Sequence, residues 1–189
     1  MYKRQVVGGG DIAREYMKII KKANLNNSIQ DLIGIAVSRI NALTLTTLYY
    51  EYPPYSIPQN LDQVLNQISI HNLIFTGGFQ PGQSTTGVAT IIAEALNAEL
   101  IIATNVDGIY DKDPRRYPNA KKYDNIRFDQ LKKIFEKKSQ EAGEYKLIDN
   151  LSLKILERSR IPVIVLNGNP PSNLLKAILG EKIGTKIIY

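Results

Sequence analysis

A glycine-rich loop followed by hydroxyl side chains is the stretch of this sequence best suited to bind phosphate. Residues 76–85 read TGGFQPGQST, and from Gly77 to Ser84 they follow the pattern G-x-x-x-x-G-K-[ST], except that Gln83 replaces the lysine. Glycines let backbone N–H groups approach an anion closely, and hydroxyl residues 84–86 stand where a helix is expected to begin. The missing lysine indicates a ligand other than a donor triphosphate. The alternative is that GG and PG are ordinary turn dipeptides.

A second glycine turn lies near the N-terminus, where GGG follows two valines. Residues 8–13 satisfy G-x-G-x-x-A, and Asp31 lies about twenty residues further on, which is the spacing of a dinucleotide fingerprint. That fingerprint needs its acidic residue at the end of a strand, whereas Asp31 begins a helical pattern over 29–48, so we reject it. The turn can still bind an anion, with Arg14 one helical turn beyond Gly10. The alternative is a tight turn beside a surface cation.

A third loop, NVDGIYDKDP at 105–114, is rich in carboxylates. Asp107, Asp111 and Asp113 can be simple turn formers, with Tyr110 an aromatic residue at the rim. Alternatively, the ring lies beside a nucleobase and the carboxylates lie near a metal ion or a ribose. The spacing leaves both interpretations open. The two glycine loops together suggest two phosphate-bearing ligands.

The elements that carry these loops follow an alternating α/β pattern. Apolar strands are predicted to end at Val7 and to cover 72–75, 100–104, 162–166 and 185–189. Helices are predicted near 12–23, 29–48, 61–68, 85–96, 128–137, 148–158 and 173–179. This alternation indicates a layered α/β fold with a mainly parallel sheet, whose ligands bind beyond the carboxyl ends of the strands.

Composition sets limits on the function. The 189 residues fit one domain, 1–189, without a secretion signal or a long apolar run, so we expect a cytoplasmic protein with no membrane partner. The absence of cysteine excludes thiolate catalysis, and His71 is more consistent with a structural or surface role. A net charge of +6 permits a polyanionic partner, but the cations are interleaved with acidic residues, which favours a solvated face over nucleic acid. The segment YYEYPPY (49–55) favours a subunit contact.

These motifs occur in the order of a known family. GGG with Arg14, then Asp31, TGGFQPGQST, ATNVDGIYDKDP and YKLIDNLSLKILERSRIPVIVLNG resemble the amino acid kinase superfamily, and within it the uridylate (UMP) kinases of archaeal type. The resemblance runs from about Val6 to the C-terminus. It implies a three-layer αβα sandwich and transfer of the ATP γ-phosphoryl group to UMP with Mg²⁺. It also implies a homo-oligomer, often a hexamer built as a trimer of dimers.

The resemblance assigns roles residue by residue. UMP would contact Gly9, Asp31, Phe79, Gln80, Pro81, Gly82, Gln83, Ser84 and Thr85. ATP would contact Gly10, Arg14, Thr104, Asn105, Tyr110 and Asp113. Asp107 and Arg14 would serve catalysis, Asp107 by organising the groups that bind phosphate, and no side chain is expected to ligate a metal. No nucleophilic side chain is needed, because the acceptor phosphate attacks in line.

One family feature does not occur. These kinases begin with a strand ending in a K-x-S-G loop that binds the transferring phosphates, whereas this chain opens MYKRQVVGGG. We therefore expect an N-terminally truncated chain that lacks the first strand and is inactive as it stands; full UDP formation by the short form, beside a version extended upstream, would refute this. The alternatives are a kinase for another small phosphate, such as isopentenyl phosphate, and a non-catalytic nucleotide-binding subunit. A nucleic-acid binder is a fourth and distant hypothesis.

Overall fold

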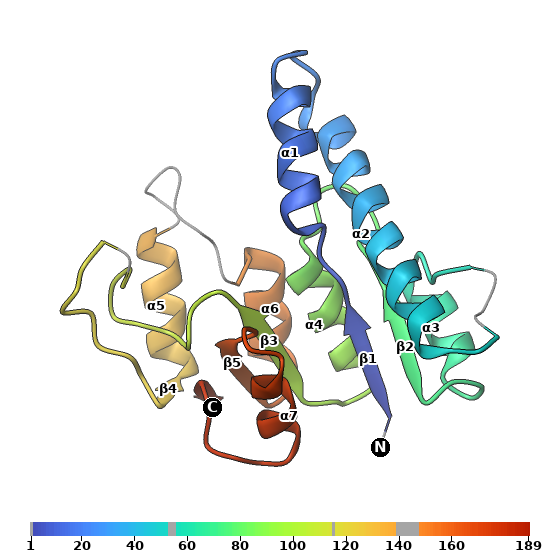
Figure 1. The fold of residues 1–189 in the computed structure, drawn as a ribbon. Helices are drawn as coiled ribbons and strands as arrows, with labels where there is room; N and C mark the ends of the chain where they lie inside the picture. The colour runs from blue at the N-terminus through green and yellow to red at the C-terminus, as the bar shows by residue number, and fades with distance from the viewer. Residues whose placement is uncertain (1, 53–55, 115, 139–147) are drawn as a thin grey trace. The chain divides into compact units, whose positions relative to one another are not determined.

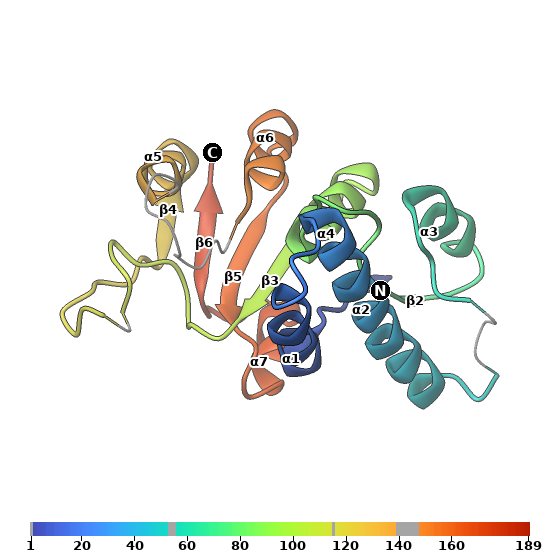
Figure 2. The same cartoon turned by 90° about the horizontal axis from the view of Figure 1, so that it is seen from above.

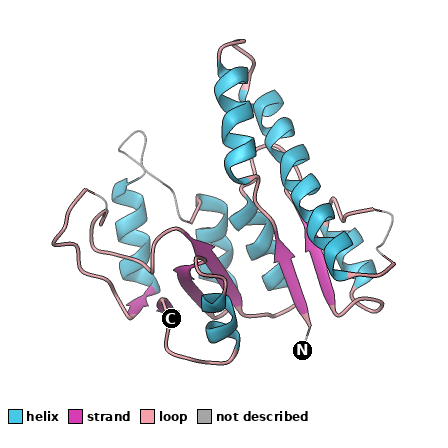
Figure 3. Cartoon of the chain, in the orientation of Figure 1, coloured by secondary structure: helices cyan, strands magenta, loops and turns pink. Residues whose placement is uncertain are grey.

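The computed structural model describes residues 2–52, 56–114, 116–138 and 148–189. The chain forms two compact units, Met1–Ile92 and Ala93–Tyr189, each with its own hydrogen-bonded sheet (Figure 1). Three of the four strand pairings are parallel, in agreement with the predicted mainly parallel α/β fold. Helices and strands alternate along most of the chain, as Figure 3 shows.

The first unit contains a two-stranded parallel sheet and the helices that pack on it. Strand β1 (Lys3–Val6) pairs with β2 (Leu73–Thr76), and Val6 lies opposite Thr76. The helices of this unit are α1 (Gly10–Lys21), α2 (Asn27–Tyr49) and α3 (Leu61–Gln67), and α4 (Thr85–Ala95) begins in it. A buried cluster of Ala42, Ile57 and Phe75 joins α2 to β2. The glycine loops therefore leave a sheet that α2 holds in place.

Helix α2 is the longest element of the first unit. The side chain of Asn26 caps its first turn by accepting a hydrogen bond from the Ile29 N–H at 3.0 Å. Ile35, Val37 and Ala42 of α2 are buried in the core of the first unit. By length and composition alone α2 is also able to cross a membrane. Its polar residues, however, form hydrogen bonds with two loops of the same unit.

The second unit contains a four-stranded sheet in the order β3-β5-β6-β4. Its strands are β3 (Leu100–Thr104), β4 (Asn125–Arg127), β5 (Val163–Asn167) and β6 (Thr185–Ile188). Figure 2 shows α5 (Phe128–Lys138) and α6 (Asn150–Ser159) on one face of this sheet and α7 (Ser172–Ile178) on the other. The core includes Ile126, Leu156 and Val165, each at most 1% exposed. Within this unit, helix, sheet and helix form the three expected layers.

Three details differ from the predicted elements. The segment MYKRQ is unlike an apolar strand in composition, yet β1 begins at Lys3, because its backbone forms the ladder with β2 while alternate side chains stay exposed. Strand β4 was missed, since three residues with one buried side chain, Ile126, give almost no periodicity. The last strand is antiparallel to β5. Of the predicted contact segment 49–55, residues 53–55 lie outside the described residues.

Candidate active site

The two glycine loops leave the same edge of the first unit's sheet. Strands β1 and β2 are parallel neighbours, so their carboxyl ends lie together. The Val7 N–H donates to the Thr76 carbonyl oxygen at 2.7 Å, which extends the ladder to the first residues of both loops. Gly8 and Gly77 then follow directly. The structure thus brings the two predicted anion-binding turns together.

The first turn leads straight into α1. Gly9 precedes the helix, and its carbonyl oxygen accepts a hydrogen bond from the Ala13 N–H at 3.2 Å. Gly10 has φ +63°, a left-handed conformation that favours glycine over residues with a Cβ. The turn therefore presents backbone N–H groups at the N-terminus of α1, where the helix dipole favours an anion.

The second loop is shaped by a tight turn and a helix cap. Residues Gln80–Gln83 form a turn closed by the Gln83 N–H and the Gln80 carbonyl oxygen at 3.3 Å. Pro81 followed by Gly82 at φ +80° is the sequence that a type II turn requires. The Ser84 hydroxyl accepts a hydrogen bond from the Gly87 N–H at 2.9 Å and so caps α4, which confirms the predicted capping role.

Asp31 joins α2 to this second loop. Its Oδ2 atom accepts a hydrogen bond from the Gly82 N–H at 2.8 Å, across 51 positions of sequence. Asp31 itself is exposed, so its carboxylate also faces solvent beside the loop. The structure therefore places Asp31 against residues 79–85, the same set that the resemblance assigns to one ligand.

Three further side chains of α2, which sequence reasoning missed, hold the two loops. Ser38 Oγ accepts from the Gly78 N–H at 2.8 Å, and Asn41 Nδ2 donates to the Gly8 carbonyl oxygen at 2.9 Å. Arg39 donates to the carbonyl oxygens of Gly78 and Phe79 at 3.0 and 2.9 Å. Within the helical pattern over 29–48, polar residues on the face toward the loops were the available signal. Helix α2 thus positions both glycine loops.

The carboxylate-rich loop lies in the second unit, beyond the carboxyl end of β3. Thr104 and Asn105 stand where β3 ends, and the Gly168 N–H after the neighbouring strand β5 donates to the Thr104 carbonyl oxygen at 2.8 Å. Tyr110 Oη donates to Asp107 Oδ1 at 2.5 Å. This hydrogen bond, with partial burial and the negative charge of Asp107, raises the pKa of Tyr110 to about 12. Tyr110 consequently stays a neutral donor that orients Asp107.

A buried threonine on β6 anchors this loop, and no sequence pattern points to it. Thr185 Oγ1 accepts from the Ile109 N–H at 2.8 Å and donates to the Tyr123 carbonyl oxygen at 2.5 Å. Asp111 Oδ1 accepts from the Lys121 N–H at 2.8 Å, which fits the turn-forming interpretation for that aspartate. The Asp113 carbonyl oxygen accepts from the N–H groups of residues 116 and 117. Among the described residues, no three His, Cys, Asp or Glu side chains gather in a way that would hold a metal ion.

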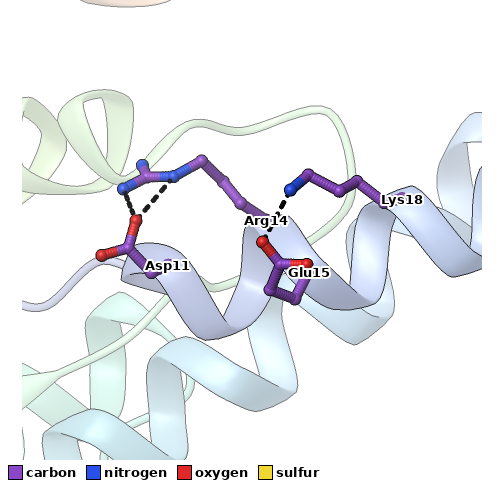
Figure 4. A network of polar contacts seen from close by, with 4 residues as sticks. All are labelled: Asp11, Arg14, Glu15 and Lys18. Carbon is purple, nitrogen blue, oxygen red and sulfur yellow. Dashed lines mark hydrogen bonds and ion pairs between the residues drawn. The ribbon is translucent and has the colours of Figure 1, made fainter.

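Arg14 lies on the exposed face of α1. Figure 4 shows its guanidinium paired with Asp11, and a second ion pair, between Glu15 and Lys18, next to it on the same helix. The side chains of Arg14 and Asp11 are 70% and 91% exposed. An ion pair this exposed is weak, so Arg14 is able to exchange Asp11 for another anion at small cost. Gly10 and Arg14 belong to the first unit, whereas Thr104, Asn105, Tyr110 and Asp113 belong to the second.

Glycine turns beyond two parallel strand ends, a helix N-terminus and a carboxylate-rich loop beyond β3 are typical of α/β proteins that bind phosphate groups. The chain belongs to the amino acid kinase family, whose model matches residues 6–167. Its relatives include archaeal uridylate kinases. The chain is 43% identical to uridylate kinase from Thermofilum pendens over 97% of this chain and 78% of that protein. For uridylate kinase from Sulfurisphaera tokodaii the identity is 45%, over 96% and 81%.

A solved structure extends the similarity to three dimensions. The crystal structure of uridylate kinase from Archaeoglobus fulgidus matches with a TM-score of 0.87 and 36% identity, over 99% of this chain and 85% of that chain. UMP kinase from Ureaplasma parvum, at 21% identity and a TM-score of 0.76, supports the fold alone. The predicted family and α/β fold are therefore confirmed.

Proposed function

We propose that this chain transfers the γ-phosphoryl group of ATP to the 5′-phosphate of UMP, giving UDP and ADP for pyrimidine nucleotide synthesis. One observation carries the proposal: identity of 43% to a uridylate kinase continues through 97% of the chain and so includes every loop described above. In the transfer, an oxygen of the UMP phosphate forms a bond to the γ-phosphorus while the bond to ADP breaks. The chain supplies position and charge complementarity for this exchange.

UMP is assigned to the first unit. Gly9, Asp31 and the seven residues from Phe79 to Thr85 would enclose it, as the resemblance implies. The hydrogen bond between Asp31 and the Gly82 N–H supports a single site, because it joins two of these segments. The site needs no lysine in the loop, since backbone N–H groups and the N-terminus of α4 suit a monophosphate.

ATP is assigned to Thr104, Asn105, Tyr110 and Asp113 of the second unit, and the resemblance, not a contact in the structure, adds Gly10 and Arg14 at its phosphates. Asp107 would organise the groups that bind phosphate, and its hydrogen bond to Tyr110 supports a fixed orientation for that carboxylate. Mg²⁺ fits this scheme as an ion that enters on the ATP phosphates, because magnesium in such sites keeps few protein ligands. It would supply charge neutralisation for the transferring group.

We also infer a cytoplasmic homo-oligomer, a hexamer arranged as a trimer of dimers. An exposed apolar stripe on α2 supports a subunit contact: Ile29, Leu32, Ile40 and Leu43 are each at least 40% exposed and recur at helical spacing. Light scattering should give a mass several times 21.2 kDa. Ile40→Asp should reduce that mass. A wild-type chain that is monomeric in light scattering would contradict the inferred homo-oligomer.

Two measurements on the purified chain test the function. UDP formation should be seen with ATP and UMP, and not with isopentenyl phosphate as the acceptor, and this result would refute the expectation that the chain is inactive. Calorimetry should show saturable UMP binding, weakened roughly tenfold, about 1.4 kcal/mol, by Asp31→Ala. Asp62→Ala, which removes an acidic residue of α3, should leave UMP binding unchanged. Phosphorylation of isopentenyl phosphate instead would overturn the assignment, and UMP binding without turnover would support a non-catalytic subunit.

A further inference from the structure

Arg39 ties together three segments of the first unit. Its Nε–H donates to the Gly78 carbonyl oxygen at 3.0 Å and an N–H of Nη2 donates to the Phe79 carbonyl oxygen at 2.9 Å. An N–H of Nη1 donates to Gln59 Oε1 at 3.0 Å. One side chain from the middle of α2 therefore reaches two consecutive carbonyls of the second glycine loop and the segment before α3. None of the roles assigned above belongs to it.

The chemistry of the guanidinium explains why an arginine stands here. Its donors point outward in one fixed plane, so two of them can bind two neighbouring carbonyls at once, which a lysine ammonium cannot do with the same geometry. Partial burial lowers the pKa of Arg39, but an arginine stays charged in proteins. Hydrogen bonds from a charged donor are stronger than neutral ones, and more so where water is partly excluded.

These hydrogen bonds set the orientation of the peptide groups in the loop. When the carbonyl oxygens of Gly78 and Phe79 turn toward Arg39, the peptide planes are fixed, and so are the directions of the N–H groups that follow. Ser38 fixes the preceding Gly78 N–H at 2.8 Å and Asp31 fixes the Gly82 N–H at 2.8 Å. Both ends of the turn are thereby attached to α2, with Arg39 between them.

We propose that Arg39 is a positioning residue for the acceptor nucleotide: its two bonds to the carbonyls of Gly78 and Phe79 hold the loop in its binding shape. The inference rests on the proposed assignment of UMP to this loop. Arg39 acts through the backbone and does not need to touch the nucleotide. Losing it should weaken the binding of UMP and leave the binding of ATP unchanged, because the second unit's loop has its own anchor in Thr185.

The test compares four variants of the whole chain by calorimetry with UMP and with ATP. Arg39→Gln and Arg39→Lys should each weaken UMP binding at least about tenfold, roughly 1.4 kcal/mol, with ATP affinity within about twofold of wild type. Gln59→Ala removes only the third partner and should leave UMP affinity within about twofold. Arg127→Gln, a matched loss of one exposed arginine paired with Asp129, should change neither affinity.

Hydrogen exchange on the free chain gives a second readout that needs no ligand. Both Arg39 variants should exchange faster at residues 79–84, while β1 and β2 keep their protection. The proposal is overturned if Arg39→Lys restores full UMP affinity, since charge alone would then suffice, or if the loop exchanges as in wild type. A wild-type chain that binds no UMP overturns the proposed function instead, and the exchange result then still decides whether Arg39 shapes the loop.

Discussion

The close packing of β2's end on α2 predicts a large effect from one methyl group at Gly77. A Cβ on Gly77 would lie 2.6 Å from Ser38 Oγ, 2.7 Å from the Arg39 backbone nitrogen and 2.8 Å from the Ser38 carbonyl carbon. Two of these neighbours are backbone atoms of a helix, and Ser38 is 2% exposed, so rotation of a side chain cannot relieve the clash. Gly77→Ala must therefore push the loop away from α2.

The cost follows from measurements on overpacked cores. Inserting a methyl group into a filled site destabilises a protein by about 1–3 kcal/mol, and for a chain of this size each kcal/mol lowers the melting temperature by roughly 2–4 °C. We therefore expect Gly77→Ala to melt about 2–12 °C below wild type. Because the displaced loop carries the Gly78 and Phe79 carbonyls, UMP affinity should fall as well. Thermal unfolding followed by circular dichroism, with calorimetry for UMP, measures both effects.

Gly34, in the helix α2 on which Gly77 packs, provides a control. A Cβ there meets nothing within 4 Å, and alanine is favoured over glycine in a helix interior by up to about 1 kcal/mol. Gly34→Ala should accordingly melt at or above the wild-type temperature. A difference of 1 °C corresponds to about 0.25–0.5 kcal/mol. A Gly77→Ala chain that melts within 1 °C of wild type and binds UMP equally well would refute this packing of Gly77 on α2.

Three further predictions concern single side chains. Ser84→Ala removes the cap of α4 and should cost about 1 kcal/mol, seen as a lower melting temperature, whereas an unchanged value would argue against the cap. The pKa of Tyr110 is raised to about 12, so the stability it contributes is full below pH 10 and is lost as pH rises toward 12. Tyr110→Phe should flatten that loss in alkaline unfolding, and Tyr52→Phe, at an 85% exposed residue, should not. Asp11→Asn frees Arg14 and should strengthen ATP binding a few-fold at low salt, while weaker binding would show that Asp11 supports the site.

Much of this fold can be predicted from the spacing of apolar residues and from the turn-forming residues between the apolar segments. The apolar run at 100–104 is a strand with the predicted bounds, and α4 ends one residue before the predicted end. Such segments are long or strongly apolar, and their ends are marked by glycine, proline or hydroxyl residues. In contrast, β1 and β4 depend on a partner strand, because neither has enough apolar side chains to be recognised alone.

The candidate site likewise contains residues that the sequence predicts and residues that it does not. The two glycine loops and the carboxylate loop can be recognised by residue type and spacing. The place of the two glycine loops at the shared edge of β1 and β2 follows from the parallel pairing of these strands. The positions of Arg39, Asn41 and Thr185 do not follow, since each binds backbone groups 33 to 76 positions away in sequence. No local pattern encodes a contact of that range. Only the packing of α2 and β6 reveals which polar residues serve the loops.

The most direct test of the account is hydrogen exchange of the chain with and without UMP. If UMP binds in the first unit as proposed, it should slow exchange at residues 77–85, while residues 104–113 change little. ATP added alone should instead slow exchange at 104–113. Protection of 104–113 by UMP, with no change at 77–85, would contradict the assignment of the acceptor to the loop TGGFQPGQST.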